Sequence, residues 1–317
     1  MTIRLGLIGA GRWGLNVIRT INETDGVELK RLGSRNPRAV TFVPSGCEVS
    51  QDWREVATAS DLDGVIITTP PALHAEMSTA AVEAGLPVMV EKPLTLSLEE
   101  AEKLRARVQE HSGYVFVDHT LLFHPAYIKL CSLAESLGAV ERVMSVGGNK
   151  GPFGKQCPPF WDYAAHDLAM ILVLLGESPS SVTGGVVESR ETEDGYGEMG
   201  EAELTFPSGA KAEISTGNLR DSKIRRVEVS FEESVIVFDD LAVDKLVQYE
   251  RDHEGPGKPI EIRAELPLTT AVTSFAGMIQ GGDMSSTGSL DLGVEVVRIL
   301  EQLSPQIRSR TDADTRG

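Results

Sequence analysis

The sequence predicts an α/β protein in which a doubly wound parallel sheet is followed by an α+β domain with an open, mainly antiparallel sheet. Near the N-terminus, a glycine-rich turn, Gly9-Ala-Gly11-Arg-Trp-Gly14, joins an apolar strand-like segment to a helical pattern. Apolar segments then alternate with helical ones up to about Asp118. Beyond that residue, short alternating segments separated by turn residues predominate. The change divides the chain into residues 1–120 and 121–317.

The first domain should contain parallel strands covered by helices on both faces. A helix is expected over residues 72–84, and Gly85 caps it. Ser97 and Glu100 form a capping box for a second helix, which ends before Gly113. The expected strands are residues 3–8, 27–32, 64–68, 87–90 and 114–117.

The second domain is expected to combine one long helix, residues 164–175, with an antiparallel sheet. Residues 188–203 hold seven carboxylates and three glycines, and we interpret them as a solvated acidic loop between strands. A last amphipathic helix, residues 290–303, is expected to pack back on the first domain. The expected strands include residues 202–206, 210–214, 226–231 and 235–238.

Composition narrows the classes of partner. The chain has 317 residues and a net charge of −17, so it repels nucleic acid and anionic lipid. A few N–H groups and basic side chains still suffice for one small anion. The three widely spaced cysteines predict neither a disulfide framework nor a zinc site. No apolar run is long enough for a membrane helix, and a cytoplasmic location is expected.

The glycine motif predicts a dinucleotide site because it follows a strand and opens a helix. Gly9 allows the tight turn, Gly11 lets the backbone approach a pyrophosphate, and Gly14 lets the helix pack on the strand. Arg12 and Trp13 lie within the turn and are counted with the cofactor-binding residues. A turn that serves only the shape of the backbone is the competing interpretation.

The segment after the second strand bears on the choice of cofactor. A fold selective for NAD usually has a carboxylate there for the adenosine ribose. This chain has Ser34, Arg35 and Arg38 and no acid, which favours the 2′-phosphate of NADP over NAD. The alternative interpretation is that Arg35 and Arg38 are exposed loop charges or stack on adenine.

Two further groups of residues suggest chemistry. Glu91-Lys92-Pro93 follows a strand at the sheet edge where open α/β folds bind ligands. Asp162 and His166 are four residues apart, so they share one face of the long helix. Considered alone, this pair is more often a helix cap and a satisfied histidine.

Together these residues resemble the Gfo/Idh/MocA family of sugar and polyol oxidoreductases over nearly the whole chain. The resemblance rests on the glycine motif, Thr68-Thr-Pro-Pro-Ala-Leu-His74, Glu91-Lys92-Pro93 and the Asp162-x-x-x-His166 helix. It implies a Rossmann domain followed by a substrate-binding and oligomerisation domain. It implies that Lys92 contacts nicotinamide ribose and substrate, that Asp162 orients the sugar and that His166 is the acid or base. It places Thr69, Pro70, His74, Glu91 and Pro93 along the cofactor.

Substrate class is the least determined feature. His124 stands where similar sequences have Asn, and is either a substrate contact or a helix-start residue. Lys150 and Lys155 fall where relatives put basic residues against substrate. We therefore expect a nucleotide sugar whose phosphates these lysines face, with free polyols such as inositol or sugar phosphates as the alternative.

Other functional classes are weighed against this one. A Gly-x-Ser-x-Gly hydrolase elbow is missing, and His119 and His124 lack a third metal ligand at a recognisable spacing. The serious competitor is a non-catalytic NAD(P)-binding sensor of the same fold. The retention of Lys92, Asp162 and His166 argues against it. The open sheet should be covered by a homodimer or homotetramer.

Overall fold

The computed structural model describes residues 2–154, 156–252, 255–282 and 287–304. By contacts, the chain divides into two units. The first comprises Met1–Phe123 and Glu265–Val297, and the second comprises His124–Ala264 and Arg298–Gly317. The first unit thus includes a returning segment from Glu265, of which the sequence analysis expected only the last helix, residues 290–303, against the first domain.

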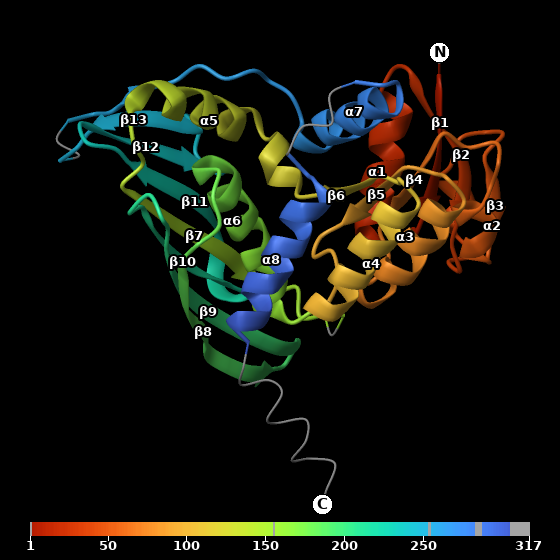
Figure 1. Cartoon of the computed structure of the whole chain (residues 1–317), viewed down its shortest axis with the longest axis horizontal. Coiled ribbons are helices and arrows are strands. Elements are labelled where there is room, and N and C mark those ends of the chain that lie inside the picture. The colour runs from red at the N-terminus through yellow and green to blue at the C-terminus, as the bar shows by residue number, and fades with distance from the viewer. Residues whose placement is uncertain (1, 155, 253–254, 283–286, 305–317) are drawn as a thin grey trace, which may run out of the picture. The chain divides into compact units, whose positions relative to one another are not determined.

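The first unit is built on a six-stranded parallel sheet with strand order β3-β2-β1-β4-β5-β6 (Figure 1). This order confirms the doubly wound topology, because the chain returns to the centre of the sheet after β3. The strands are β1 (Ile3–Ile8), β2 (Val27–Gly33), β3 (Glu48–Ser50), β4 (Gly64–Ile67), β5 (Val88–Glu91) and β6 (Val115–Asp118).

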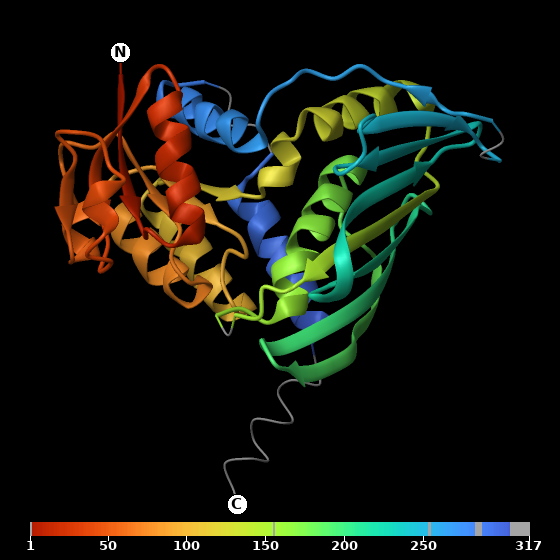
Figure 2. The same cartoon turned by 180° about the vertical axis from the view of Figure 1, so that it is seen from behind.

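Helices form two groups around this sheet. Helix α1 contacts α7, whereas α2 contacts α3 and α3 contacts α4. Figure 2 shows α1 in front of the sheet. Ser97 Oγ accepts the Glu100 N–H at 3.3 Å, which confirms the predicted cap of α4. The helices are α1 (Arg12–Glu23), α2 (Trp53–Ala57), α3 (His74–Glu83), α4 (Leu98–Glu110) and α7 (Pro267–Ile279), with short 3-10 turns at Ala39–Thr41, Pro71–Leu73 and Thr120–Phe123.

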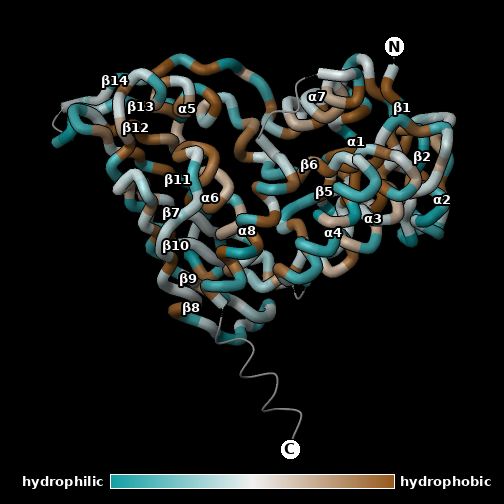
Figure 3. Tube along the Cα trace, viewed as in Figure 1, coloured by the Kyte–Doolittle hydropathy of each residue, from teal (hydrophilic) through white to brown (hydrophobic). Residues whose placement is uncertain are grey.

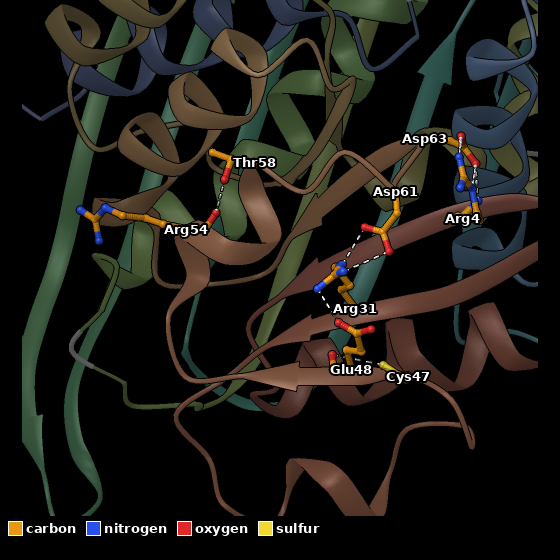
Figure 4. A network of polar contacts seen from close by, with 8 residues as sticks. All are labelled: Arg4, Arg31, Cys47, Glu48, Arg54, Thr58, Asp61 and Asp63. Carbon is orange, nitrogen blue, oxygen red and sulfur yellow. Dashed lines mark hydrogen bonds and ion pairs between the residues drawn. The ribbon is translucent and has the colours of Figure 1, made fainter.

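Ion pairs connect several strands and loops of the first unit. Arg4 bonds Asp63 at 2.7 Å, and Arg31 bonds both Asp61 at 2.7 Å and Glu48 at 2.6 Å (Figure 4). Arg4 lies at the beginning of β1 and Asp63 directly precedes β4. The Arg4–Asp63 pair therefore lies at the edge of the sheet opposite to its carboxyl ends, whereas Arg31 lies within β2 and joins it to the start of β3.

The second unit contains an eight-stranded sheet with strand order β14-β13-β12-β11-β7-β10-β9-β8. All neighbouring strands are antiparallel except β7 and β10, which confirms a mainly antiparallel sheet. Hydropathy alternates along several of these strands (Figure 3). The strands are β7 (Arg142–Lys150), β8 (Ser181–Thr192), β9 (Gly195–Thr205), β10 (Lys211–Gly217), β11 (Leu219–Ser230), β12 (Ser234–Asp239), β13 (Leu246–Glu250) and β14 (Lys258–Pro259).

Helices α5 (Pro125–Leu137) and α6 (Pro159–Leu175) cover one face of this sheet, as Figures 1 and 2 show. Helix α6 contacts β7, β9 and β10, and α5 contacts β12. Among the described residues, no helix covers the other face. The last helix, α8 (Leu290–Gln302), begins in the first unit and ends in the second.

The expected acidic loop at residues 188–203 is wrong. This segment is most of a long hairpin in which β8 and β9 pair from Ser181–Thr205 to Thr192–Gly195. Glu193 and Asp194 form the two-residue turn between the paired residues Thr192 and Gly195, a loop length typical of a hairpin. Glu198 is only 3% exposed, and its carboxylate accepts the Phe160 N–H at 3.1 Å, at the start of α6. Charge density alone misled the sequence interpretation, because exposed strands tolerate carboxylates.

Candidate active site

The three glycines of the turn after β1 differ in the space that is available for a side chain. Gly9 has φ +105°, and a Cβ there would lie 2.9 Å from the Thr68 backbone. A Cβ on Gly14 would lie 2.2 Å from the Gly9 carbonyl oxygen, so this contact between turn and helix requires glycine. A Cβ on Gly11 would meet nothing within 4 Å. The open approach at Gly11 and the close packing at Gly14 fit a pyrophosphate-binding turn.

The start of α1 is suited to an anion. Gly11 caps the helix with no side-chain hydrogen bond, and its first turn holds no acidic residue. The first N–H groups of a helix have no partner within the helix, and the helix dipole favours negative charge there. Arg12 and Trp13, the first two helical residues, are exposed, Trp13 by 37%. The described residues thus fit the phosphates of a dinucleotide.

The turn after β2 contains the hydroxyl and the two arginines predicted from the sequence. Ser34 Oγ accepts the Asn36 N–H at 3.1 Å, and the Asn36 side chain accepts the Arg38 N–H at 3.1 Å. Arg35 and Arg38 are both exposed. The polar bonds within the turn set its shape and leave two cations at its surface.

His74 connects two of the predicted cofactor segments. Its ring is fully enclosed, at 0% exposure, and lies 2.8 Å from the Thr69 carbonyl oxygen and 3.0 Å from the Pro93 carbonyl oxygen. Burial lowers the pKa of His74, although both contacts favour a proton on the ring. Thr69 and Pro70 are partly exposed, whereas His74 contacts backbone. His74 therefore holds the segment after β4 against the segment after β5.

Asp118, the last residue of β6, is the buried centre of this edge. It is paired with Glu91 in the sheet register and is 2% exposed. Thr120 Oγ1 donates to its carboxylate at 3.0 Å, and Glu91 and the Trp13 side chain also hydrogen-bond it. Burial raises the pKa of Asp118 to about 6 against these bonds and the charge of Lys92.

Lys92 lies directly after β5, as predicted, beside this pair. Its backbone N–H donates to Glu91 Oε2 at 2.9 Å. The neighbouring His119 is 1% exposed, and neither ring nitrogen has a hydrogen-bond partner among the described residues. Burial first, and the charge of Lys92 second, lower the pKa of His119 to about 3. A buried neutral imidazole and the carboxyl groups of Glu91 and Asp118 thus belong to the surroundings of the lysine.

Helix α6 carries Asp162 and His166, both half-buried, one turn apart as predicted. The next residue, Asp167, is 6% exposed and accepts the Ser145 Oγ proton at 2.6 Å, which ties α6 to β7. Burial raises the pKa of Asp167 to about 6 against this hydrogen bond. The Tyr127 hydroxyl donates to the Met170 carbonyl at 2.6 Å and holds α5 on α6. The helix that presents Asp162 and His166 is therefore fixed from two sides.

The remaining predicted substrate residues belong to the second unit. His124 is the N-cap of α5, since its Nδ1 accepts the Ala126 N–H at 3.1 Å. The proton of the ring is then on Nε2, which lies 3.2 Å from Asp240 Oδ1. These contacts describe the helix-start residue, one of the two roles that the sequence left open. Lys150 is exposed at the end of β7, and Lys155 lies outside the described residues.

Each unit brings together part of the predicted site. The first collects the glycine turn, the turn after β2 and the segments of Thr69, His74 and Lys92; the second holds Asp162 and His166. Sequence reasoning missed Asp118 and Asp167. Asp118 could have been found because it ends a buried strand at the ligand-binding edge, whereas the tie from Asp167 to Ser145 spans 22 residues and leaves no local pattern.

Comparisons with known proteins agree with this geometry. The family model GFO_IDH_MocA, described as an oxidoreductase family with an NAD-binding Rossmann fold, matches residues 3–119. A solved structure from Magnetospirillum magnetotacticum MS-1, provisionally described as an oxidoreductase, is 40% identical in sequence to this chain. The two structures have a TM-score of 0.89, and the match covers 96% of this chain and 100% of that one. A UDP-N-acetylglucosamine 3-dehydrogenase from Acidithiobacillus ferrooxidans shares the fold, with a TM-score of 0.82 at 22% identity and coverage of 96% and 97%.

Among curated proteins, the inositol 2-dehydrogenase of Rhizobium meliloti (strain 1021) is 28% identical over 197 residues, which is 58% of this chain and 58% of that protein. The chain thus matches little more than half the length of the first curated relatives. Within the described residues, no helix combines the length and apolar character needed to cross a bilayer.

Proposed function

The chain belongs to the Gfo/Idh/MocA oxidoreductase family, and from that premise we propose that it transfers a hydride between NAD(P) and a secondary hydroxyl or keto carbon of a sugar. The observation that carries the proposal is Asp118, which bonds both Trp13 of the glycine turn and Glu91 beside Lys92. One buried carboxyl group thereby connects the phosphate-binding turn to the candidate catalytic lysine.

The residues of the chain have separate roles in this reaction. A bound nicotinamide supplies or accepts the hydride. Lys92, as a nearby cation, stabilises the alkoxide that develops on the substrate oxygen. His166 exchanges the hydroxyl proton, and Asp162 orients the sugar. Lys92 competes with His166 for the proton, because a lysine amine becomes a base where its pKa is lowered.

For the cofactor, NADP is proposed in preference to NAD. Ser34, Arg35 and Arg38 line the turn where an acid would select NAD, and Arg35 and Arg38 are exposed. A planar guanidinium pairs with phosphate oxygens through two hydrogen bonds. NAD remains the alternative cofactor.

For the substrate, a nucleotide sugar is proposed, with free polyols such as inositol or sugar phosphates as the alternative. The relatives bear names of both kinds, since one is an inositol dehydrogenase and another acts on UDP-N-acetylglucosamine. A homodimer or homotetramer formed through the open face of the second sheet and a cytoplasmic location belong to the same proposal. The described cysteines are free thiols, which agrees with a reducing compartment.

The test is turnover. NADPH, NADP, NADH and NAD are each mixed with a panel of nucleotide sugars, sugar phosphates, free sugars and inositols, and the nicotinamide absorbance is followed. A change of absorbance that requires both enzyme and sugar supports the oxidoreductase. Tight cofactor binding without turnover of any panel member favours the competing function, a non-catalytic NAD(P) sensor.

A further inference from the structure

An unusual charge cluster lies in the second unit beside His124, and the sequence did not single out its cations. Arg225, Lys223 and Lys245 all pair with one carboxylate, Asp240, at N–O distances of 3.0, 3.9 and 3.8 Å. His124 contacts the same carboxylate through Nε2 at 3.2 Å. We call Lys223, Arg225 and Lys245 the basic cluster.

The basic cluster holds more positive charge than its carboxylate neutralises. Burial would raise the pKa of Asp240, but the His124 hydrogen bond and the charges of Arg225 and Lys223 outweigh it and lower the pKa to about 2. Asp240 is thus ionised at neutral pH and contributes one negative charge against three positive ones. Such a surplus is notable in a chain whose net charge is −17.

Exposure leaves the cations available to a ligand. The Asp240 side chain is 16% exposed, whereas those of Arg225, Lys245 and Lys223 are 31%, 34% and 47% exposed. The backbone also fixes their spacing, because the Asp240 N–H donates to the Arg225 carbonyl and the Asp239 N–H to the Lys245 carbonyl. The carboxylate is an internal anchor, and the cations present their remaining N–H donors to solvent.

Strand register places the basic cluster on the helix-covered face of the sheet. Val227 pairs with Ser145, the residue that bonds Asp167 of α6, and Arg225 pairs with Gly147 two positions further along β7. Alternate residues of a strand share a face, so Arg225 lies on the side of the sheet that α6 covers. The charge of Arg225 also acts on Asp167. The basic cluster and the helix of Asp162 and His166 therefore lie on one side of the sheet.

We propose that Lys223, Arg225 and Lys245 bind a phosphate group of the substrate. The inference deepens the proposed function and rests on it for the view that this phosphate belongs to a substrate. A phosphate ester carries a charge of about −1.5 to −2 at neutral pH and several acceptor oxygens. One guanidinium and two ammonium groups supply a planar fork and two mobile point charges for such an anion. The substrate class becomes a sugar phosphate or a nucleotide sugar rather than an uncharged polyol.

The experiment measures phosphate binding rather than turnover. The full chain is first saturated with reduced cofactor, so that the glycine turn cannot contribute a second phosphate site. Inorganic phosphate is then titrated and followed by the broadening of its ³¹P NMR signal. Lys223→Met and Lys245→Met are combined in one variant, since methionine keeps an unbranched chain and removes the charge. We expect its affinity for phosphate to fall at least about tenfold, because two charge-assisted contacts are lost.

Two matched variants complete the design. Arg142→Met removes an exposed cation that pairs with Glu213 at 2.7 Å on the same sheet, and it should leave phosphate affinity unchanged. Lys150→Met tests the site suggested by the sequence. Phosphate affinity that is unchanged in the double variant, or that falls only with Lys150→Met, would overturn the inference. Circular dichroism of each variant confirms that its fold is intact.

A last set of measurements distinguishes a sugar phosphate from a nucleotide sugar as the source of the phosphate. It also distinguishes failure of the phosphate site from failure of the proposed oxidoreductase. Displacement of inorganic phosphate by a hexose monophosphate or by a uridine diphosphate sugar supports the inference, and the stronger competitor identifies the source. Phosphate binding through the basic cluster without any turnover would contradict the proposed oxidoreductase while leaving the phosphate site intact. Turnover of sugars with no phosphate bound at the basic cluster would leave the oxidoreductase and remove the phosphate site.

Discussion

Two carboxyl groups, one in each unit, differ in what dominates their surroundings. In the first unit, Asp118 is almost fully enclosed, and burial raises its pKa to about 6 although Thr120, Glu91 and Lys92 act to lower it. In the second, burial would raise the pKa of the half-buried Asp240, but the His124 hydrogen bond and the charges of Arg225 and Lys223 lower it to about 2. The difference teaches that the pKa of a carboxyl group depends on the balance between its burial and the charges and hydrogen bonds of its neighbours.

The largest expected effect tests whether the two units carry separate parts of the chemistry. Lys92→Ala in the first unit and His166→Ala in the second should each lower kcat by about 10² to 10⁴, the range for loss of acid or base assistance. Cofactor titration monitored by fluorescence should show binding that persists in both variants. Near-normal turnover of His166→Ala would remove the histidine from the mechanism and leave Lys92 as the base.

Asp118→Asn tests the first carboxyl environment. Because the native pKa, about 6, exceeds the ordinary value of 3.8, native Asp118 binds its proton more tightly than the unfolded chain does. The wild type should therefore lose stability as pH rises from about 4 to 6, by up to about 3 kcal/mol from this group. The asparagine variant should lack this loss and be the more stable protein at pH 7 in urea unfolding. A variant that is less stable at pH 7 contradicts the assignment.

Arg35→Ala tests the cofactor preference of the first unit. If its guanidinium holds a 2′-phosphate, NADP(H) should bind the wild type more tightly than NAD(H), and the variant should lose about 1.5 to 3 kcal/mol of that preference. Calorimetric titration of both cofactors measures it, and Arg19→Ala, an exposed position within α1, is the control. Tighter binding of NAD(H) by the wild type would contradict the NADP proposal.

Asp240→Asn should change the free energy of unfolding at pH 7 in the opposite direction to Asp118→Asn. It should be the smallest of these effects. Its depressed pKa adds stability that is complete above about pH 4 and is lost as pH falls towards 2. Partial exposure of its cationic partners screens the interaction, so we expect the variant to be destabilised by about 1 to 2 kcal/mol at pH 7. Chemical unfolding at pH 7 and pH 3 measures this difference. Equal stability of variant and wild type at pH 7 would mean that Asp240 gains nothing from its neighbours.

Local sequence was sufficient for the first unit, apart from β3, α2 and α7. Gly9, Gly11 and Gly14 occur within one turn, and Lys92 follows its strand directly, so the features that define the cofactor edge are contiguous. Strands that are buried on both faces are continuous hydrophobic segments, which makes them easy to recognise in the sequence. The α6 pair, Asp162 and His166, was equally readable because helical spacing places them on one face.

The tertiary structure alone decided which distant residues meet. Asp118 meets Trp13 across 105 positions of sequence. Asp240 is contacted by Lys223 and Arg225 from β11, by Lys245 from the turn before β13 and by His124 from a helix start. Strand register determines which side chains of a sheet become neighbours, and it depends on the packing of a whole face and not on any one segment. The sequence therefore determined the fold and the cofactor motif, whereas the electrostatic state of the buried carboxyl groups and the basic cluster emerged only from the pairing of distant strands.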